Sequence, residues 1–324
     1  MDIKKQEKRI LLIFISSILL YTVFVLLADI KKILSASAKF NWRIIPLLLL
    51  FSFLNYVFRF FRWHYLLRKI NIILPLKKSF QIFFSGICMT VTPGKMGEVL
   101  KAYLVKKETG NRFSEMVPLL VFERMTDGIA MIILALGGVY FFRQSIIFFV
   151  FSTLMVVGFI IFIYAKEMVV KLIKRFEKRF FHIKILDFVI TFFENSQKLL
   201  TGKNLATAVG LGIIAWAFEG ISLFLLVNQF VVGAIHESPL QGLFYSLFIF
   251  SFSSIAGFLA LIPGGVGVAE GSITSFLMLF FKMALPQALF ITIIFRFITL
   301  WFGVSMGLLF LVWILKKHQA RLKN

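Results

Sequence analysis

The chain has few of the residues from which metal and redox sites are built. One cysteine, Cys88, and four histidines occur in 324 residues. A single cysteine excludes an intrachain disulfide and a cysteine-based metal cluster. The histidines lie far apart without metal-ligand spacing, and we interpret them as structural: His64, His182, His236 and His318. We therefore assign no catalytic residue and expect no cofactor and no bound metal.

Acidic residues are also scarce. The chain has 15 Asp and Glu against 36 Lys and Arg, which gives a net charge of +21. Such a charge can indicate nucleic-acid binding, but here the basic residues lie in short loops between apolar stretches. That distribution is typical of the cytoplasmic loops of membrane proteins, and it attracts anionic lipid headgroups. The partners we expect are membrane lipids, most of all anionic ones, and no nucleic acid.

Apolar residues dominate the composition. They make up 60% of the chain, and the mean hydropathy is +0.92, which is far outside the range of soluble domains. The stretches predicted to cross the membrane are 10–27, 44–61, 117–142, 145–164, 205–227 and 288–315. They use most of the length and leave no room for a separate soluble catalytic domain. The fold class is therefore an all-α polytopic membrane protein.

Two similar breaks interrupt the apolar sequence, at Thr92–Glu98 and at Ile262–Gly267. Each break contains Pro followed by glycines. The apolar run before the first break, 79–91, is shorter than the roughly 20 residues needed to cross a membrane. Interrupted apolar segments at corresponding positions of two halves indicate the binding site of a transporter.

The basic clusters decide the topology. If 79–104 crossed the membrane, the basic region 165–203 and the C-terminus would lie outside the cell. A re-entrant hairpin over 79–104 instead keeps the basic clusters in the cytoplasm. By the same reasoning, 243–281 enters from the outer side. We therefore predict six full spans and two re-entrant hairpins in an inverted-topology repeat, in the cell membrane with both termini cytoplasmic. The alternative is two unrelated broken helices.

The predicted organisation has five parts. They are an N-terminal helix and connection (1–43), a first repeat (44–142) with hairpin 79–104, a span with an amphipathic cytoplasmic linker (143–204), a second repeat (205–315) with hairpin 243–281, and a basic cytoplasmic tail (316–324).

Charged residues inside the spans are the main candidates for function. Arg124 and Arg296 each follow one of the two breaks. A charge inside a membrane span costs about 2.5–3.5 kcal/mol and usually faces a partner or a wet cavity. Arginine forks onto phosphate oxygens, so both residues are predicted to bind an anionic headgroup.

The acidic residues offer the arginines a different role. Arg124 can pair with Glu98 or Asp127, and Arg296 can pair with Glu270 or Glu219, which would lock the hairpins to the helices. Both roles can hold in turn during a transport cycle. Glu123 and Asp127 lie one turn apart on one helix face and would repel each other.

Glycines and basic residues near the breaks complete the predicted site. The glycines let the backbone approach a ligand, and the helices that follow present free N–H groups. A plain helix break is the alternative. Arg59, Arg62 and Trp63 lie at the predicted end of a span and are typical of snorkelling interface anchors. The sharper alternative for these residues is a gate that receives a lipid phosphate, and Arg62 is counted among the predicted substrate-binding residues. The remaining predicted ligands are Gly94, Lys95, Gly97, Gly264, Gly265 and Gly267.

Five ordered stretches resemble a known family. They are Phe58–Leu67, Thr92–Ala102, Phe122–Asp127, Ile262–Gly271 and Phe295–Arg296. Together they are similar to the flippase-like transmembrane domain of lysylphosphatidylglycerol synthases, which also occurs as stand-alone proteins of bacteria and archaea. The resemblance implies movement of a lipid between leaflets and, for some archaeal members, a link to polyprenyl-phosphate sugar carriers. It does not extend to the soluble aminoacyl-transferase domain, so we expect no such activity. Lys95 departs from the family but keeps the positive charge.

The leading hypothesis is a flippase or scramblase that holds the headgroup of an anionic phospholipid or polyprenyl-phosphate-linked lipid between the hairpin tips. Glu98, Asp127 and Glu270 would compete for the arginines and carry coupling protons. Without an ATP-binding motif, transport is passive or ion-driven. One alternative is a membrane-embedded lipid-phosphate enzyme that uses Glu123 and Asp127. Another is a scaffold that recruits a cytoplasmic lipid-modifying enzyme through 165–203.

Overall fold

The computed structural model describes residues 37–38, 40–92, 99–141, 146–165, 167–169, 171, 183–230 and 239–323. This part of the chain is almost entirely helical and contains no strand, which confirms the all-α prediction. Its elements are η1 (Trp42–Ile44), α3 (Ile45–Lys69), α4 (Leu76–Ile87), η2 (Cys88–Val91), α5 (Val99–Thr109), α6 (Phe113–Phe141), α7 (Ile146–Tyr164), α9 (Ile183–Leu199), α10 (Gly202–Val227), α11 (Pro239–Leu259), η5 (Pro263–Gly265), α12 (Val268–Phe281), α13 (Leu285–Arg296), η6 (Phe297–Trp301) and α14 (Phe302–Lys323).

Within the described residues, five helices are long and apolar enough to cross a membrane. They are Trp42–Lys69, Gly202–Val227, Pro239–Leu259, Pro263–Phe281 and Leu285–Ile314. Three of them contain or coincide with predicted spans, and the other two are the arms of the predicted second hairpin. Because each arm is long enough to cross, the re-entrant path of this hairpin and the side from which it enters both stay predictions. The predicted span 10–27 lies outside the described residues.

The first predicted hairpin consists of two short helices. α4 has 12 residues and α5 has 11, so each is less than about 20 Å long at 1.5 Å per residue. The hydrocarbon core of a membrane is about 30 Å thick. Their lengths therefore agree with a hairpin that does not cross, and the two helices pack against each other. The break itself, at 93–98, lies outside the described residues.

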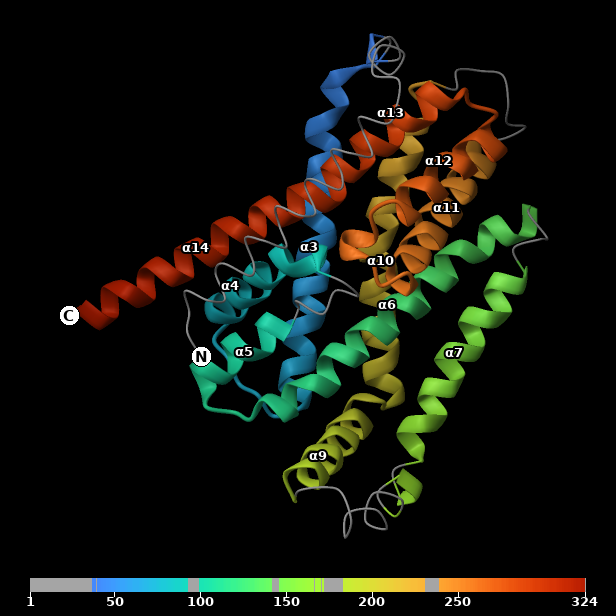
Figure 1. Ribbon diagram of the computed structural model, residues 1–324. Helices are drawn as coiled ribbons and strands as arrows, with labels where there is room; N and C mark the ends of the chain where they lie inside the picture. Colours follow the sequence, from blue (N-terminus) through green and yellow to red (C-terminus); the bar gives the residue numbers. More distant parts are fainter. Residues whose placement is uncertain are drawn as a thin grey trace.

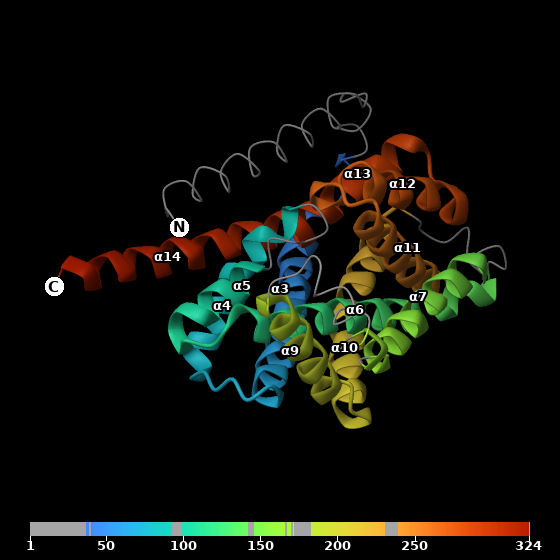
Figure 2. The same cartoon turned by 60° about the horizontal axis from the view of Figure 1, so that its bottom comes forward.

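The two halves of the chain exchange their contacts. α3 packs along α10, α6 packs on α11, and α14 packs on α4. The helix after each hairpin thus contacts the hairpin of the other half, as expected of two related repeats. Figures 1 and 2 show α4 and α5 on one side of α3, and α11 and α12 on the other. The 3₁₀ turns at the hairpin ends, η2 and η5, are in contact.

Glycines make these exchanged contacts close. A Cβ atom on Gly307 of α14 would overlap the backbone of Cys88 in η2. In the other half, a Cβ on Gly138 of α6 would overlap the side chain of Phe248 in α11. Small residues at helix interfaces are a general device of membrane proteins, because they let the backbones approach. The position of the long α13–α14 segment therefore depends on the absence of a side chain at Gly307.

Gly307→Ala is expected to destabilise the protein by about 1–3 kcal/mol, as overpacking of a filled interior does. Gly210→Ala is the matched control, because Gly210 lies in α10 and a Cβ there would meet nothing within 4 Å. This control is expected to be neutral or stabilising by up to about 1 kcal/mol. Thermal midpoints of the purified variants in one detergent would measure both, and equal midpoints would contradict the close packing.

The linker between the halves contributes one described helix, α9. Asn195 of α9 donates a hydrogen bond from Nδ2 to the backbone oxygen of Glu115, at 3.3 Å. Phe193 and Leu199 are buried, and α9 packs on α6 (Figure 2). The amphipathic helix expected in this linker is therefore present, while its predicted place on the membrane surface stays a prediction.

Candidate functional site

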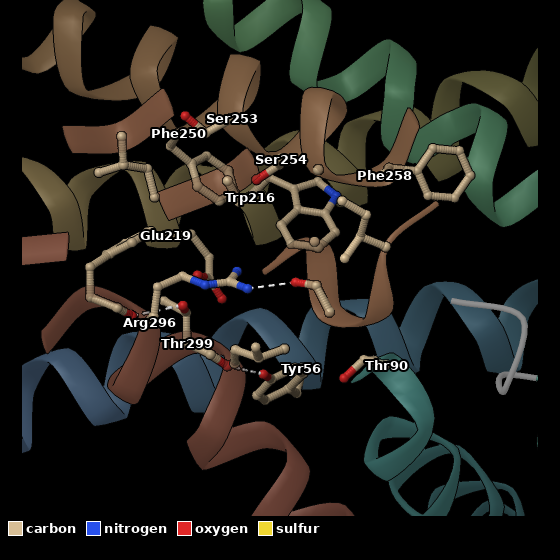
Figure 3. Close-up of a pocket in the computed structure, with 18 of the residues that line it drawn as sticks. Tyr56, Thr90, Trp216, Glu219, Phe250, Ser253, Ser254, Phe258, Arg296 and Thr299 are labelled. Carbon is tan, nitrogen blue, oxygen red and sulfur yellow. Dashed lines mark hydrogen bonds between the residues drawn. The ribbon is translucent and has the colours of Figure 1, made fainter. Parts of the chain in front are cut away.

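A cavity of about 100 Å³, lined by both polar and apolar residues, lies where the ends of the two hairpins meet α3 and α10. This volume accommodates polar groups or a few water molecules. Its polar side chains come from Tyr56, Arg59, Thr90, Thr92, Trp216, Glu219, Ser253, Ser254, Arg296 and Thr299. Figure 3 shows Tyr56, Trp216, Glu219 and Arg296 around it. Both halves of the chain therefore contribute charged and polar side chains to one cavity inside an apolar bundle.

Arg296 fastens the second hairpin to α13. Its Nε donates to Oε1 of Glu270 at 2.6 Å, and its Nη2 donates to the backbone oxygen of Gly264 at 2.6 Å (Figure 3). The Glu270 side chain is fully buried. Glu270 and Glu219 are the two predicted partners of Arg296, and the contact with Glu270 is present. Glu219 lines the same cavity.

Glu270 and the glycines hold the hairpin end in its shape. Glu270 Oε2 accepts a hydrogen bond of 2.7 Å from the backbone N–H of Gly267 and so caps α12. Gly264, Gly265 and Gly267 have φ angles of 62°, 67° and 89°, which only glycine adopts at little cost. The N–H of Gly267, which the sequence suggested for a ligand, is thus already occupied by a carboxylate of the same hairpin.

A second cation of the cavity comes from α3. The Arg59 guanidinium lies 4.7 Å from the centre of the Trp216 ring and 5.8 Å from that of Tyr56, within cation–π range. The Tyr56 hydroxyl donates to the backbone oxygen of Thr299 at 2.6 Å. Thr299 belongs to η6, a π-helical turn directly after Arg296, and such turns occur often at functional sites.

The interpretation of Arg59, Arg62 and Trp63 as interface anchors is wrong. All three are buried, with 5%, 0% and 0% of their surfaces exposed. α3 continues to Lys69, beyond the predicted end of this span at residue 61. The three side chains therefore lie within the helix bundle, where they contact α6, α10 and neighbouring rings.

A second polar cluster surrounds Asp127 of α6. Oδ1 of Asp127 accepts from Arg62 Nη2 at 2.6 Å and from Trp216 Nε1 at 2.8 Å. Arg124 Nη2 lies 3.0 Å from Oδ2. The predicted pair of Arg124 with Asp127 is therefore present, and Arg62 joins it. Arg124 is not among the residues that line the cavity, whereas Arg296 is. The two arginines therefore belong to different sites, and Trp216 contacts both, since it lines the cavity and donates to Asp127.

Glu123 has a cation that the sequence analysis missed. Lys101 Nζ of α5 lies 2.8 Å from Glu123 Oε2, and both side chains are buried. The same ammonium lies 4.6 Å from the centre of the Trp63 ring and 5.2 Å from that of Phe83. Glu123 and Asp127 thus each face a different cation, which offsets their mutual repulsion. Four predicted site residues lie outside the described residues: Gly94, Lys95, Gly97 and Glu98.

No three His, Cys, Asp or Glu side chains come together as a metal site within the described ranges.

Comparison with protein families matches residues 11–307 to the family described as the lysylphosphatidylglycerol synthase TM region. The chain belongs to this family. A relative from Methanocaldococcus jannaschii, the UPF0104 membrane protein MJ1078, is 26% identical over 186 residues, which cover 56% of this chain and 74% of that protein.

Membership of the lysylphosphatidylglycerol synthase TM family confirms the resemblance found in the sequence. The matched region runs through α3 to the beginning of α14. It therefore contains the cavity, the Asp127 cluster and the Lys101–Glu123 pair. This member of the family is a membrane protein with several apolar helices.

Proposed function

We propose that this protein moves an anionic phospholipid or a polyprenyl-phosphate-linked lipid between the two leaflets, with the headgroup in the cavity between the hairpin ends. The observation that carries the proposal is the pair of arginines, Arg59 and Arg296, that line one cavity inside an apolar bundle. Charges at membrane depth are costly and mark substrate paths. Membership of a family named for the membrane region of a lipid synthase supports a lipid substrate.

Arg296 is the residue best suited to hold the phosphate. Its two present acceptors are Glu270 and the backbone oxygen of Gly264, and phosphate oxygens match the same guanidinium fork. When phosphate replaces them, the end of the second hairpin loses its bonds to α13. Headgroup binding would then favour a state in which that hairpin has moved, because a ligand shifts a population toward the state that binds it better.

The rest of the lipid would stay in the bilayer. Ser253, Ser254 and Thr90 line the cavity with hydroxyl groups, which suit polar headgroup atoms, while the apolar chains remain among lipid tails. We propose passive or ion-driven movement, with Glu98, Asp127, Glu219 and Glu270 as candidates for coupling. We further propose that both termini face the cytoplasm, in keeping with the basic loops.

The test is a leaflet-exposure assay. The protein would be reconstituted into vesicles that contain fluorescent phosphatidylglycerol or fluorescent phosphatidylcholine, and dithionite would quench the label exposed outside. We expect quenching of both leaflets, with phosphatidylglycerol faster. Both lipids carry the phosphate, but the choline of phosphatidylcholine would bring its own positive charge beside Arg59 and Arg296. Quenching limited to the outer leaflet, as in protein-free vesicles, would refute the proposal. Mass spectrometry of the same lipids would reveal any new product of an enzyme.

A further inference from the structure

Asp127 is shared by two guanidinium groups. Arg62 of α3 binds Oδ1 and Arg124 of α6 lies at Oδ2, so both guanidinium groups contact this carboxylate. The indole N–H of Trp216 also donates to Oδ1. The cluster is therefore rich in donors. Trp216 lines the cavity, but Arg62, Arg124 and Asp127 do not, so the cluster is separate from the cavity.

Arg62 has hydrogen-bonding groups to spare. The side chain is completely buried, and Nη2 is its only nitrogen that donates a hydrogen bond among the described residues. Nε and Nη1 are buried without an acceptor there. Nη1 faces α10 at Gly212, where an added Cβ would lie 3.0 Å away. Buried donors without acceptors are costly, so the site is short of an acceptor.

Arg124 is the more exposed arginine of the cluster. Its side chain is 18% exposed, although its Nε and Nη2 are buried, whereas the Arg62 side chain is not exposed at all. An anion approaching from the surface would therefore meet the Arg124 side chain before that of Arg62. Two guanidinium forks suit a tetrahedral anion with several oxygens better than a simple halide.

We propose that Arg62 and Arg124 form a second anion site, distinct from the cavity, that binds a phosphate group. The phosphate belongs either to a lipid headgroup or to free phosphate, and Asp127 is its built-in competitor. The site goes beyond the proposed lipid movement, because its occupancy is a binding property that is measured without transport.

The test removes the competitor. Asp127→Asn keeps the shape of the side chain but removes its charge. We expect the variant to bind inorganic phosphate about 10- to 100-fold more tightly than the wild type, the range of one hydrogen bond to a charged group. The measurement is the thermal midpoint of the full chain in a maltoside detergent, which carries no phosphate, against phosphate concentration, at ionic strength held constant with potassium chloride.

Two further variants decide the assignment. Adding Arg62→Met to Asp127→Asn is expected to abolish the gain in phosphate affinity. If that protein does not fold, Asp127→Asn with Arg124→Gln, changed at the partly exposed arginine, must abolish it instead. Lys101→Met with Glu123→Gln is the matched control, since it removes a buried carboxylate one turn away on α6 together with its cation and should give no gain.

A lipid arm distinguishes the two sources of phosphate. Phosphatidylglycerol added to the same detergent micelles, without free phosphate, should raise the midpoint of Asp127→Asn if lipid headgroups reach the site. A response to free phosphate alone would identify a site for a soluble anion. No response to either, or a response that persists without Arg62 and Arg124, would overturn the proposal.

Discussion

Arg296→Gln should stop lipid movement and also lower the stability of the protein. The change removes a cation that lines the cavity. It also leaves Glu270, which is fully buried, without the guanidinium that neutralises it. Breaking one side of a buried ion pair typically costs about 3–5 kcal/mol. Lipid movement would be followed by dithionite quenching and stability by the unfolding midpoint of the same preparation.

Arg296→Gln combined with Glu270→Gln separates these two effects. Neutral side chains of similar size leave no buried charge uncompensated, so much of the lost stability should return. Lipid movement should not return, because the phosphate still has no guanidinium to bind. Arg296→Lys keeps the charge but loses the planar fork, and we expect roughly a tenfold slower rate. A double variant that moves lipid at the wild-type rate would exclude Arg296 as the headgroup ligand.

Lys101→Met is expected to destabilise the protein by about 3–5 kcal/mol. Lys101 is not among the residues that line the cavity. Lys101 of α5 neutralises Glu123 of α6, and both side chains are at most 2% exposed. Methionine fills a similar volume but leaves the Glu123 carboxylate buried and uncompensated. Lys101→Met with Glu123→Gln should regain most of the loss. Thermal unfolding in detergent would measure each variant.

The chain contains a matched control for this effect. Lys78 and Glu108 form an ion pair of 2.6 Å between α4 and α5, but their side chains are 29% and 39% exposed. Exposed pairs contribute about 0–1 kcal/mol, so Lys78→Met should change the unfolding midpoint little. Equal losses in the Lys78 and Lys101 variants would show that burial does not set the strength of the Lys101–Glu123 pair.

Some features of the site were predictable because membranes penalise charge so strongly. An arginine within an apolar run needs a partner, and few acidic residues are available in the chain. That reasoning offered Glu270 or Glu219 to Arg296 and Glu98 or Asp127 to Arg124. The contacts with Glu270 and Asp127 are present. The glycine-rich end of the second hairpin was predictable for a similar reason, since Pro and consecutive glycines rarely continue a helix.

Lys101 was not predictable in the same way. It follows the first break and lies in a stretch rich in lysine, which the charge pattern assigns to a cytoplasmic loop. Its burial depends on the packing of α5 against α6 and on Gly86 of α4, where a Cβ would overlap the Lys101 side chain. These are contacts between helices, and no local pattern in the sequence encodes them.

The α3 residues had a usable signal that hydropathy concealed. Tyr56, Arg59 and Trp63 are spaced three and four residues apart, which places them on one face of a helix. A mixed aromatic and basic face of this kind also fits a helix packed inside a bundle. Hydropathy alone ended the span near residue 61, because it cannot distinguish a charge in water from a charge that is paired inside the protein.

The π-helical turn η6 sets how the second half of the last helix is presented to the first hairpin. The turn lies between Arg296 and Gly303, and a Cβ on Gly303 would overlap the Tyr56 hydroxyl just as one on Gly307 would overlap Cys88. Transfer of one residue from the wide turn into a regular α-helix would rotate everything beyond it by about 100° and shift it by about 1.5 Å. The wide turn therefore fixes the rotation of α14 relative to α13. With this rotation, Gly303 and Gly307 face α3 and η2, while Arg296 contacts the second hairpin.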